Sequence, residues 1–255
     1  MSGGKDDALV AWADIAAALG LLTRLPVPVD GDRAVARGAR AAWAWPVAGL
    51  AVAVLAALAA ETALRLDLPA VVAACVAVAV QAAVTGAMHE DGLADTCDGL
   101  WGGWTRERRL EIMRDSHVGT YGVLALILSV AVRVSLIAAL AGDAMWPALL
   151  AAGALSRGAM ATAMGALPFA RTDGLAKGVG RPGGATVGLA LAVAGLAGIA
   201  LVGWGAVVAA LVVGVAAVAV CLIARTRIGG QTGDILGAVQ QVSEIAALAT
   251  LVAML

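Results

Sequence analysis

The residues best suited to chemistry lie in one polar segment, which begins at His89-Glu90-Asp91 and continues through Asp95 and Asp98. Asp91, Asp95 and Asp98 are spaced i, i+4 and i+7, so a helix would place their carboxylates on one face. Three carboxylates this close repel one another unless a cation lies between them. Oxygen ligands of this kind suit Mg²⁺, and we therefore expect a magnesium site here.

Two other interpretations of this segment are weaker. A water-exposed acidic loop would have no need to place its acids at helical spacing. A zinc site is disfavoured because the His-Glu pair does not continue into the HExxH pattern. The same segment supplies three candidates for a general base, His89, Glu90 and Asp91, and the sequence does not choose among them.

Three later segments carry groups that suit a diphosphate. The first mixes an arginine, an imidazole and hydroxyls with glycines, which let backbone amides approach an anion. In the second, two cations are equally suited to binding a diphosphate and to anchoring a loop. The third is rich in glycine, and its Asp234 is a fourth candidate metal ligand. The candidate phosphate ligands in these segments are Arg114, Asp115, His117, Arg171, Lys177 and Thr232.

The rest of the chain is apolar enough to require a membrane. Of its 255 residues, 62% are hydrophobic and 14% are charged, and the mean hydropathy is +0.93. Soluble domains are about 45–50% apolar and about 25% charged. Runs of about 20 apolar residues can span a bilayer. The seven such runs are Ala42–Leu64, Pro69–Met88, Gly119–Leu140, Trp146–Leu167, Gly184–Gly203, Gly205–Cys221 (with Ala224 as an alternative end) and Asp234–Met254.

These runs predict an all-α fold, a polytopic transmembrane helix bundle of about seven spans, as a single integral-membrane domain over residues 1–255. Asp7–Leu25 is too polar for a clean span, and the helical spacing of its apolar residues predicts an additional interfacial or re-entrant helix. Pro26 and Pro28 would end this helix. We expect no cleavable signal peptide, because the acidic start lacks a basic region.

The basic residues predict the orientation of the bundle. Fourteen of the 17 Lys and Arg residues precede the first span or follow the second, fourth and sixth, which places them on one side. Only Arg65 lies on the other side. Because positively charged loops stay in the cytoplasm, we expect a multi-pass protein of a bacterial inner membrane whose N-terminus and active site face the cytoplasm.

Three charged residues, Arg133, Arg157 and Glu244, lie well inside the proposed spans, where charge is a sign of function. Arg133 and Arg157 could contact phosphate, or either could pair with Glu244 in the bundle, and the two alternatives are equal at this stage. A net charge of −1 predicts no nucleic-acid partner. Three cysteines without a CxxC pair predict neither a disulfide framework nor a zinc framework.

The segment HEDGLADTCDGLWGGWTRERRLEIMRDSHVGTYG resembles the cobalamin synthase family, the adenosylcobinamide-GDP ribazoletransferases. The resemblance extends to LLTRLPVP, LPFARTDGLAKGVG and GGQTGDILGAVQQVSE, and so covers nearly the whole chain in order. The DGLADTCDG core is its most specific part. The sequence departs from the family pattern at His117, where members often carry arginine, and at Gln240-Gln241, near which some carry a carboxylate.

The resemblance implies a phosphoryl transfer at the membrane. A hydroxyl of α-ribazole, or of its 5′-phosphate, would attack the cobinamide-bearing phosphorus of adenosylcobinamide-GDP, so that GMP leaves and adenosylcobalamin or its 5′-phosphate forms. The resemblance also implies dependence on Mg²⁺, in agreement with the spaced carboxylates. The implied partners are the two substrates and the lipid bilayer. The sequence leaves the oligomeric state open, a homo-oligomer included.

Two rival interpretations fit the sequence less well. A CDP-alcohol phosphotransferase also uses spaced aspartates and Mg²⁺, but its pattern has DGxxAR followed by GxxxDxxxD. Here Asp95 follows DGLA, and the second motif is absent from the sequence. An ion or solute transporter would place acids near the bilayer midplane, whereas here they cluster at the ends of spans.

Overall fold

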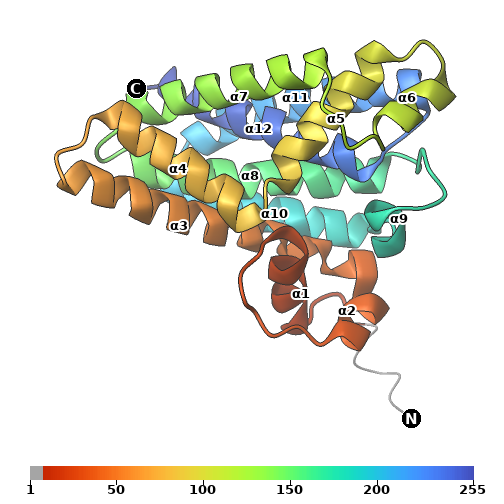
Figure 1. The fold of residues 1–255 in the computed structure, drawn as a ribbon. Helices are drawn as coiled ribbons and strands as arrows, with labels where there is room; N and C mark the ends of the chain where they lie inside the picture. Colours follow the sequence, from red (N-terminus) through yellow and green to blue (C-terminus); the bar gives the residue numbers. More distant parts are fainter. Residues whose placement is uncertain (1–7) are drawn as a thin grey trace.

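Residues 8–255 are described by a computed structural model, and the regular elements within this range are all helices (Figure 1). In chain order they are α1 (Ala13–Leu22), α2 (Gly31–Arg37), the 3-10 helix η1 (Gly38–Ala44), α3 (Trp45–Arg65), α4 (Ala70–Thr85), α5 (Met88–Gly102), α6 (Arg106–Ile112), α7 (Thr120–Ala139), α8 (Met145–Ala166), α9 (Leu175–Val179), α10 (Gly184–Val202), α11 (Gly205–Ile228) and α12 (Gly233–Val252). The all-α prediction is confirmed.

The helix lengths confirm a bundle of about seven spans. Five segments are long and apolar enough to cross a membrane, namely Gly31–Arg65, which ends with α3, and helices α7, α10, α11 and α12. The bent pair of α4 and α5 is a sixth. The 22 residues of α8 reach about 33 Å and complete the seven. Each predicted span coincides with a helix to within a few residues, except that α11 continues to Ile228.

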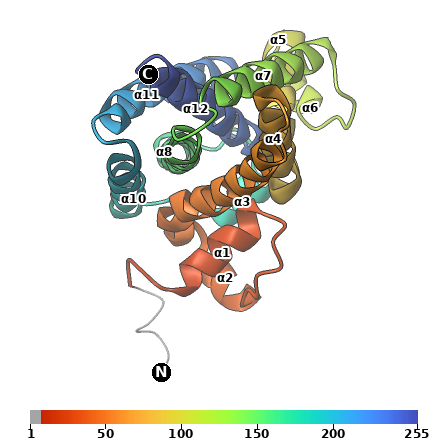
Figure 2. The same cartoon turned by 90° about the vertical axis from the view of Figure 1, so that its left-hand side faces the viewer.

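Helix α8 lies at the centre of the bundle, where it packs against α3, α10, α11 and α12 (Figure 2). Its polar residues are tolerated because other helices, rather than lipid, surround it. Small residues let these helices approach closely. Where α3 crosses α8, a Cβ atom added to Gly49 would lie 2.1 Å from the carbonyl oxygen of Gly153, so a side chain there would force the two helices apart.

A sharp break between α4 and α5 positions the acidic segment. The two helices meet at 89°, because Gly86 and Ala87 both adopt left-handed backbone conformations with φ of 65° and 55°. The alanine pays about 1–2 kcal/mol for this conformation. The predicted second span therefore ends at Thr85 rather than Met88. Helix α4 forms one arm of this broken span, and α5, which carries four carboxylates, turns away from the line of α4 and packs against α7 and α12.

The predicted N-terminal helix is confirmed as α1, which packs against η1 and α3 beside the bundle (Figure 1). It ends at Leu22, before the two prolines. The buried carboxylate of Asp14 accepts hydrogen bonds from Arg37 Nε at 2.8 Å and Trp43 Nε1 at 2.7 Å, which fix α1 to the start of the first span. Asp7 and Lys5 lie outside the described residues.

The two ends of the bundle differ in their connections. Short turns over residues 66–69, 140–144 and 203–204 lie at the end that also holds the C-terminus (Figure 1). Helices α5, α6 and α9 and the segment 229–232 lie at the opposite end, which we call the polar end. Within the described range, Arg65 is the only cation in the short turns or at their flanking helix ends, as the predicted alternation of spans requires.

Candidate active site

Helix α5 presents its aspartates at the start of α12. Asp91 is exposed, Asp95 is half-buried, and the intervening Gly92 faces α12. A Cβ atom on Gly92 would lie 2.9 Å from the carbonyl oxygen of Asp234, so glycine at this position permits the close crossing of the two helices. The helical spacing predicted from the sequence is thereby confirmed, and Asp234 joins the aspartates of α5.

Asp98 has a role that its spacing did not predict. Its carboxylate is buried and accepts hydrogen bonds from the backbone N–H groups of Gly119 at 2.7 Å and Gly122 at 2.9 Å. These donors belong to the first turn of α7, which otherwise lacks a side-chain cap. Asp98 therefore fixes the N-terminus of α7 to α5, and a negative charge is favourable at this position of a helix.

The acidic face opens onto a cavity of about 180 Å³ at the polar end. Residues from α5, the segment before α9, α9 and the start of α12 line it, so segments that are distant in sequence meet at this cavity. Arg171 Nη1 lies 3.3 Å from Asp234 Oδ2, and the Thr232 hydroxyl donates to the same carboxylate at 3.0 Å. The charged and hydroxyl residues that line the cavity are Asp91, Arg171, Asp173, Lys177, Thr232 and Asp234.

Backbone contacts hold two of these segments together. The N–H of Ala170 donates to the Gln231 carbonyl and the N–H of Gln231 donates to the Pro168 carbonyl, both at 2.8 Å. A Cβ atom on Gly230 would lie 2.1 Å from the Pro168 oxygen, so this approach requires glycine. Arg106, one of the cations expected to mark the cytoplasmic side, donates to the carbonyl oxygens of Ala170 and of Ile228 at the end of α11, and so ties this region to α6.

The carboxylate of Asp95 interacts strongly with its acidic neighbours. Burial, together with the nearby carboxylates of Asp91, Asp234 and Asp98, raises the pKa of Asp95 to about 7, and Arg171 offsets this only in part. Within residues 8–255, no three Asp, Glu, His or Cys side chains form a ready chelating group as they stand. The crowding of oxygen ligands that keeps a proton on Asp95 is nevertheless what a divalent cation would relieve, so these residues fit Mg²⁺.

The three candidate bases occupy different environments. His89 is 2% exposed, lines a separate apolar cavity and has no hydrogen-bond partner at Nε2. Glu90 is buried and accepts from Arg133 Nη1 at 2.8 Å. Asp91 alone among the three lines the cavity of the candidate site.

The predicted phosphate ligands are only partly assembled around the cavity. Arg114 forms an ion pair with Asp173, which brings the segment before α7 to the cavity rim. Asp115 and His117 are exposed on that segment and do not line the cavity. Their hydrogen bond of 2.6 Å lowers the pKa of Asp115. Lys177 lies 4.7 Å from the centre of the Phe169 ring, a cation–π contact within the cavity wall.

Known proteins are similar in sequence to this chain over almost its whole length. The profile of the family described as Cobalamin-5-phosphate synthase matches residues 14–252. The chain belongs to the cobalamin-5-phosphate synthase family. This membership favours the resemblance seen in the sequence over the CDP-alcohol phosphotransferase and transporter alternatives.

Individual relatives are also similar to this chain over most of its length. A relative from Bradyrhizobium diazoefficiens, named adenosylcobinamide-GDP ribazoletransferase, is 47% identical over 238 residues, which are 92% of each chain. A relative of the same name from Rhizobium etli strain CFN 42 is 45% identical over 253 residues, 93% of this chain and 95% of the relative. A third relative of this name, from Azorhizobium caulinodans, is 45% identical over 247 residues, which are 92% of this chain and 94% of the relative. No solved structure matches.

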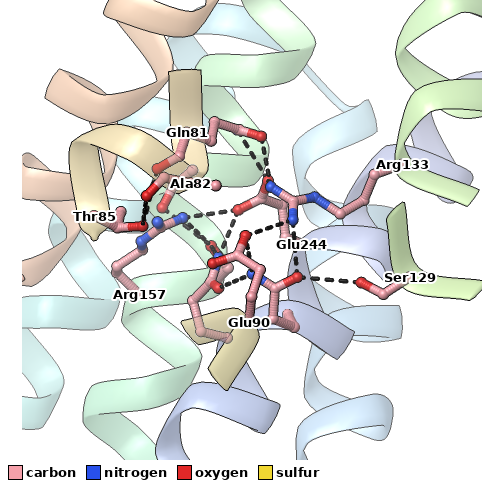
Figure 3. A network of polar contacts seen from close by, with 12 residues as sticks. Gln81, Ala82, Thr85, Glu90, Ser129, Arg133, Arg157 and Glu244 are labelled. Atoms are coloured by element: carbon pink, nitrogen blue, oxygen red, sulfur yellow. Dashed lines mark hydrogen bonds and ion pairs between the residues drawn. The ribbon is translucent and has the colours of Figure 1, made fainter. Parts of the chain in front are cut away.

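Behind the cavity, this member of the cobalamin-5-phosphate synthase family holds a buried polar network (Figure 3). Arg133 Nη1 donates to Glu90 at 2.8 Å, Arg133 Nη2 lies 3.4 Å from Glu244, and Arg157 Nη1 donates to Glu244 at 2.8 Å. The alternative of structural pairing is thus confirmed for both arginines. Because Glu90 belongs to α5 and Glu244 to α12, the network fixes the helices that carry Asp91, Asp95 and Asp234.

Glutamines complete this network, and the sequence reasoning missed them. Gln81 accepts from Arg133 Nη2 at 2.6 Å and donates to Glu244 at 3.0 Å. Gln241 accepts from Arg133 and donates to Glu90, and Gln240 donates to Glu244. The available signal was an amide side chain inside an apolar span, which needs a polar partner in the bundle.

Proposed function

We propose that this protein transfers the adenosylcobinamide-phosphate group of adenosylcobinamide-GDP to a hydroxyl of α-ribazole or of α-ribazole 5′-phosphate, with release of GMP. The observation that carries the proposal is the single cavity that brings Asp91, Asp234, Arg171 and Lys177 together from separate segments. Such a transfer needs carboxylates that can hold a metal cation and positively charged side chains that can bind a diphosphate. The names of the relatives agree with this reaction.

We assign Asp95 and Asp234 to hold Mg²⁺, which would neutralise charge on the diphosphate. Arg171 and Lys177 bind the oxygens of the departing GMP, and Asp98 holds α7 behind the site. The attacking hydroxyl forms a bond to the cobinamide-bearing phosphorus while the bond from that phosphorus to the bridging oxygen breaks. GMP leaves with the bridging oxygen, and Asp91, which lines the cavity, accepts the hydroxyl proton.

The test is a comparison of two corrinoid substrates. Purified protein in lipid vesicles with α-ribazole and Mg²⁺ should convert adenosylcobinamide-GDP into a new corrinoid and an equal amount of GMP. Adenosylcobinamide phosphate lacks GMP as a leaving group and should give no product. Chromatography of nucleotides and corrinoids measures both. Product from adenosylcobinamide phosphate, or GDP in place of GMP, would contradict the proposal.

We propose further that the polar end faces the cytoplasm of the bacterial inner membrane, because the basic residues gather there. In a variant with its three native cysteines replaced by alanine, a cysteine at position 106 or 177 should resist an impermeant thiol reagent added to intact cells. A cysteine at position 143, in a turn of the opposite end, should react. The reverse pattern of labelling would overturn this orientation.

Binding of Mg²⁺ should release protons near pH 7. Because the pKa of Asp95 is about 7, the carboxyl is about half protonated at that pH, and a bound cation displaces the proton. Addition of MgCl₂ to weakly buffered protein should therefore acidify the solution at pH 7, and much less at about pH 9, where Asp95 is already ionised. A pH dye follows the change. Equal release from the wild type and Asp95→Asn would assign the proton to another group.

A further inference from the structure

An apolar groove of about 420 Å³ lies on the lipid-facing side of the bundle, away from the candidate active site. Helices α10 and α11 form its two edges and α8 forms its floor (Figure 2). Near their shared turn the edges touch, since a Cβ atom on Gly198 would lie 3.1 Å from the Cβ of Ala206. Farther toward the polar end, Gly195 and Gly214 have no neighbour within 4 Å of an added Cβ, so the edges have separated.

The groove has the length of one membrane leaflet. Its lining on α11 runs from Ala210 to Arg225, which at 1.5 Å per residue is about 22 Å. The hydrocarbon part of one leaflet is half of the bilayer core, about 15 Å thick. The groove therefore crosses the apolar part of the leaflet at the polar end and reaches its headgroup level at Arg225.

The chemistry of the groove matches a phospholipid. Arg225 is the only charged residue in the lining, and neither α10 nor α11 contains an acid. Within residues 8–255, the Arg225 guanidinium has no ion-pair or hydrogen-bond partner and is exposed. The hydroxyl of Thr162, also in the lining, is already bonded to the Gly158 carbonyl at 2.9 Å. One unpaired cation thus stands at the open end of an otherwise apolar channel.

We propose that this groove binds one acyl chain of an anionic phospholipid, with the headgroup phosphate at Arg225. Water does not fill an apolar channel of this kind, and hydrocarbon is the surrounding medium. A zwitterionic headgroup would bring its own cation to a place that offers it no carboxylate, so a net negative headgroup is favoured.

The proposal is tested with two lipids that share their acyl chains. Protein in nanodiscs of equal dioleoyl-phosphatidylglycerol and dioleoyl-phosphatidylcholine is released into detergent, and retained lipid is measured by native mass spectrometry. One phosphatidylglycerol should remain per protein, at about fivefold preference over phosphatidylcholine. Arg225→Gln should abolish the preference. Gly214→Leu, whose added side chain enters open space in the groove, should abolish retention of both lipids.

Two matched variants control for general effects. Ala219→Leu adds bulk to an exposed position of α11 outside the groove, and Arg108→Gln removes a cation of the polar end that pairs with Glu111. Both should retain phosphatidylglycerol as the wild type does, and circular dichroism should show the same helix content in all variants. Equal retention of the two lipids by the wild type, unchanged retention in Gly214→Leu, or a lipid-free dimer would overturn the proposal.

Discussion

Replacement of Asp95 by asparagine should lower turnover at least about a hundredfold while the protein still folds and inserts. Asp95 lies among three other carboxylates, and the charge it shares with them is what would hold Mg²⁺ against the diphosphate. Electrostatic stabilisation of this kind contributes several kcal/mol to a transition state, and each 1.4 kcal/mol is about a factor of ten. Asparagine keeps the size of the side chain and removes only the charge.

The measurement is the rate of GMP release across a titration of Mg²⁺, with Asp143→Asn as the matched control. Asp143 is an exposed aspartate in a short turn at the opposite end of the bundle, so its replacement should leave the rate unchanged. Raising Mg²⁺ should restore part of the activity of Asp95→Asn if the other carboxylates still hold the ion weakly. Near-normal activity of this variant at every Mg²⁺ concentration would exclude a metal role for Asp95.

The second large effect should come from the buried network. Arg133→Met removes a fully buried guanidinium that bonds Glu90, Gln81 and Gln241. Breaking a buried ion pair from one side costs about 3–5 kcal/mol, because the remaining charge is left without a partner. The free energy of unfolding, measured by SDS titration in mixed micelles, should fall by that amount. The exposed pair of Arg65 and Glu61 supplies the control, since Arg65→Met should cost at most about 1 kcal/mol.

A rescue experiment separates lost charge balance from lost packing. Adding Glu90→Gln to Arg133→Met removes the carboxylate that the first change leaves unpaired, so the double variant should regain part of the lost stability. If the double variant is less stable than Arg133→Met alone, then packing rather than charge accounts for the network, and its place behind the active site has a different cause.

The sequence predicted the spans well because lipid imposes a strong rule on every residue that faces it. The prediction was less accurate where packing between helices decides the backbone conformation and the point at which a helix ends. The break at Gly86-Ala87 escaped it, because apolar residues continue to Met88 and nothing local requires a left-handed alanine. The extension of α11 to Ile228 was missed because Arg225 and Arg227 look like loop residues, although cations suit the last turn of a helix.

The site was predicted only in part, because local spacing can be read from the sequence and contacts between distant segments cannot. Helical spacing within one segment is local, so the shared face of Asp91 and Asp95 could be predicted, as could the gathering of basic segments on one side. Asp98 was different, because its partners are backbone N–H groups more than twenty residues away. No pattern in the sequence around Asp98 indicates that the N-terminus of α7 will lie against it.

The central claim is that a nucleoside hydroxyl attacks the cobinamide-bearing phosphorus and that GMP departs. It is tested most directly with α-ribazole that carries ¹⁸O in its reacting hydroxyl, mixed with adenosylcobinamide-GDP, Mg²⁺ and the protein in vesicles. Mass spectrometry of the products should find the label wholly in the new corrinoid and none in GMP. Unlabelled corrinoid product, or label in the released nucleotide, would mean that a different bond is broken and would contradict the proposed reaction.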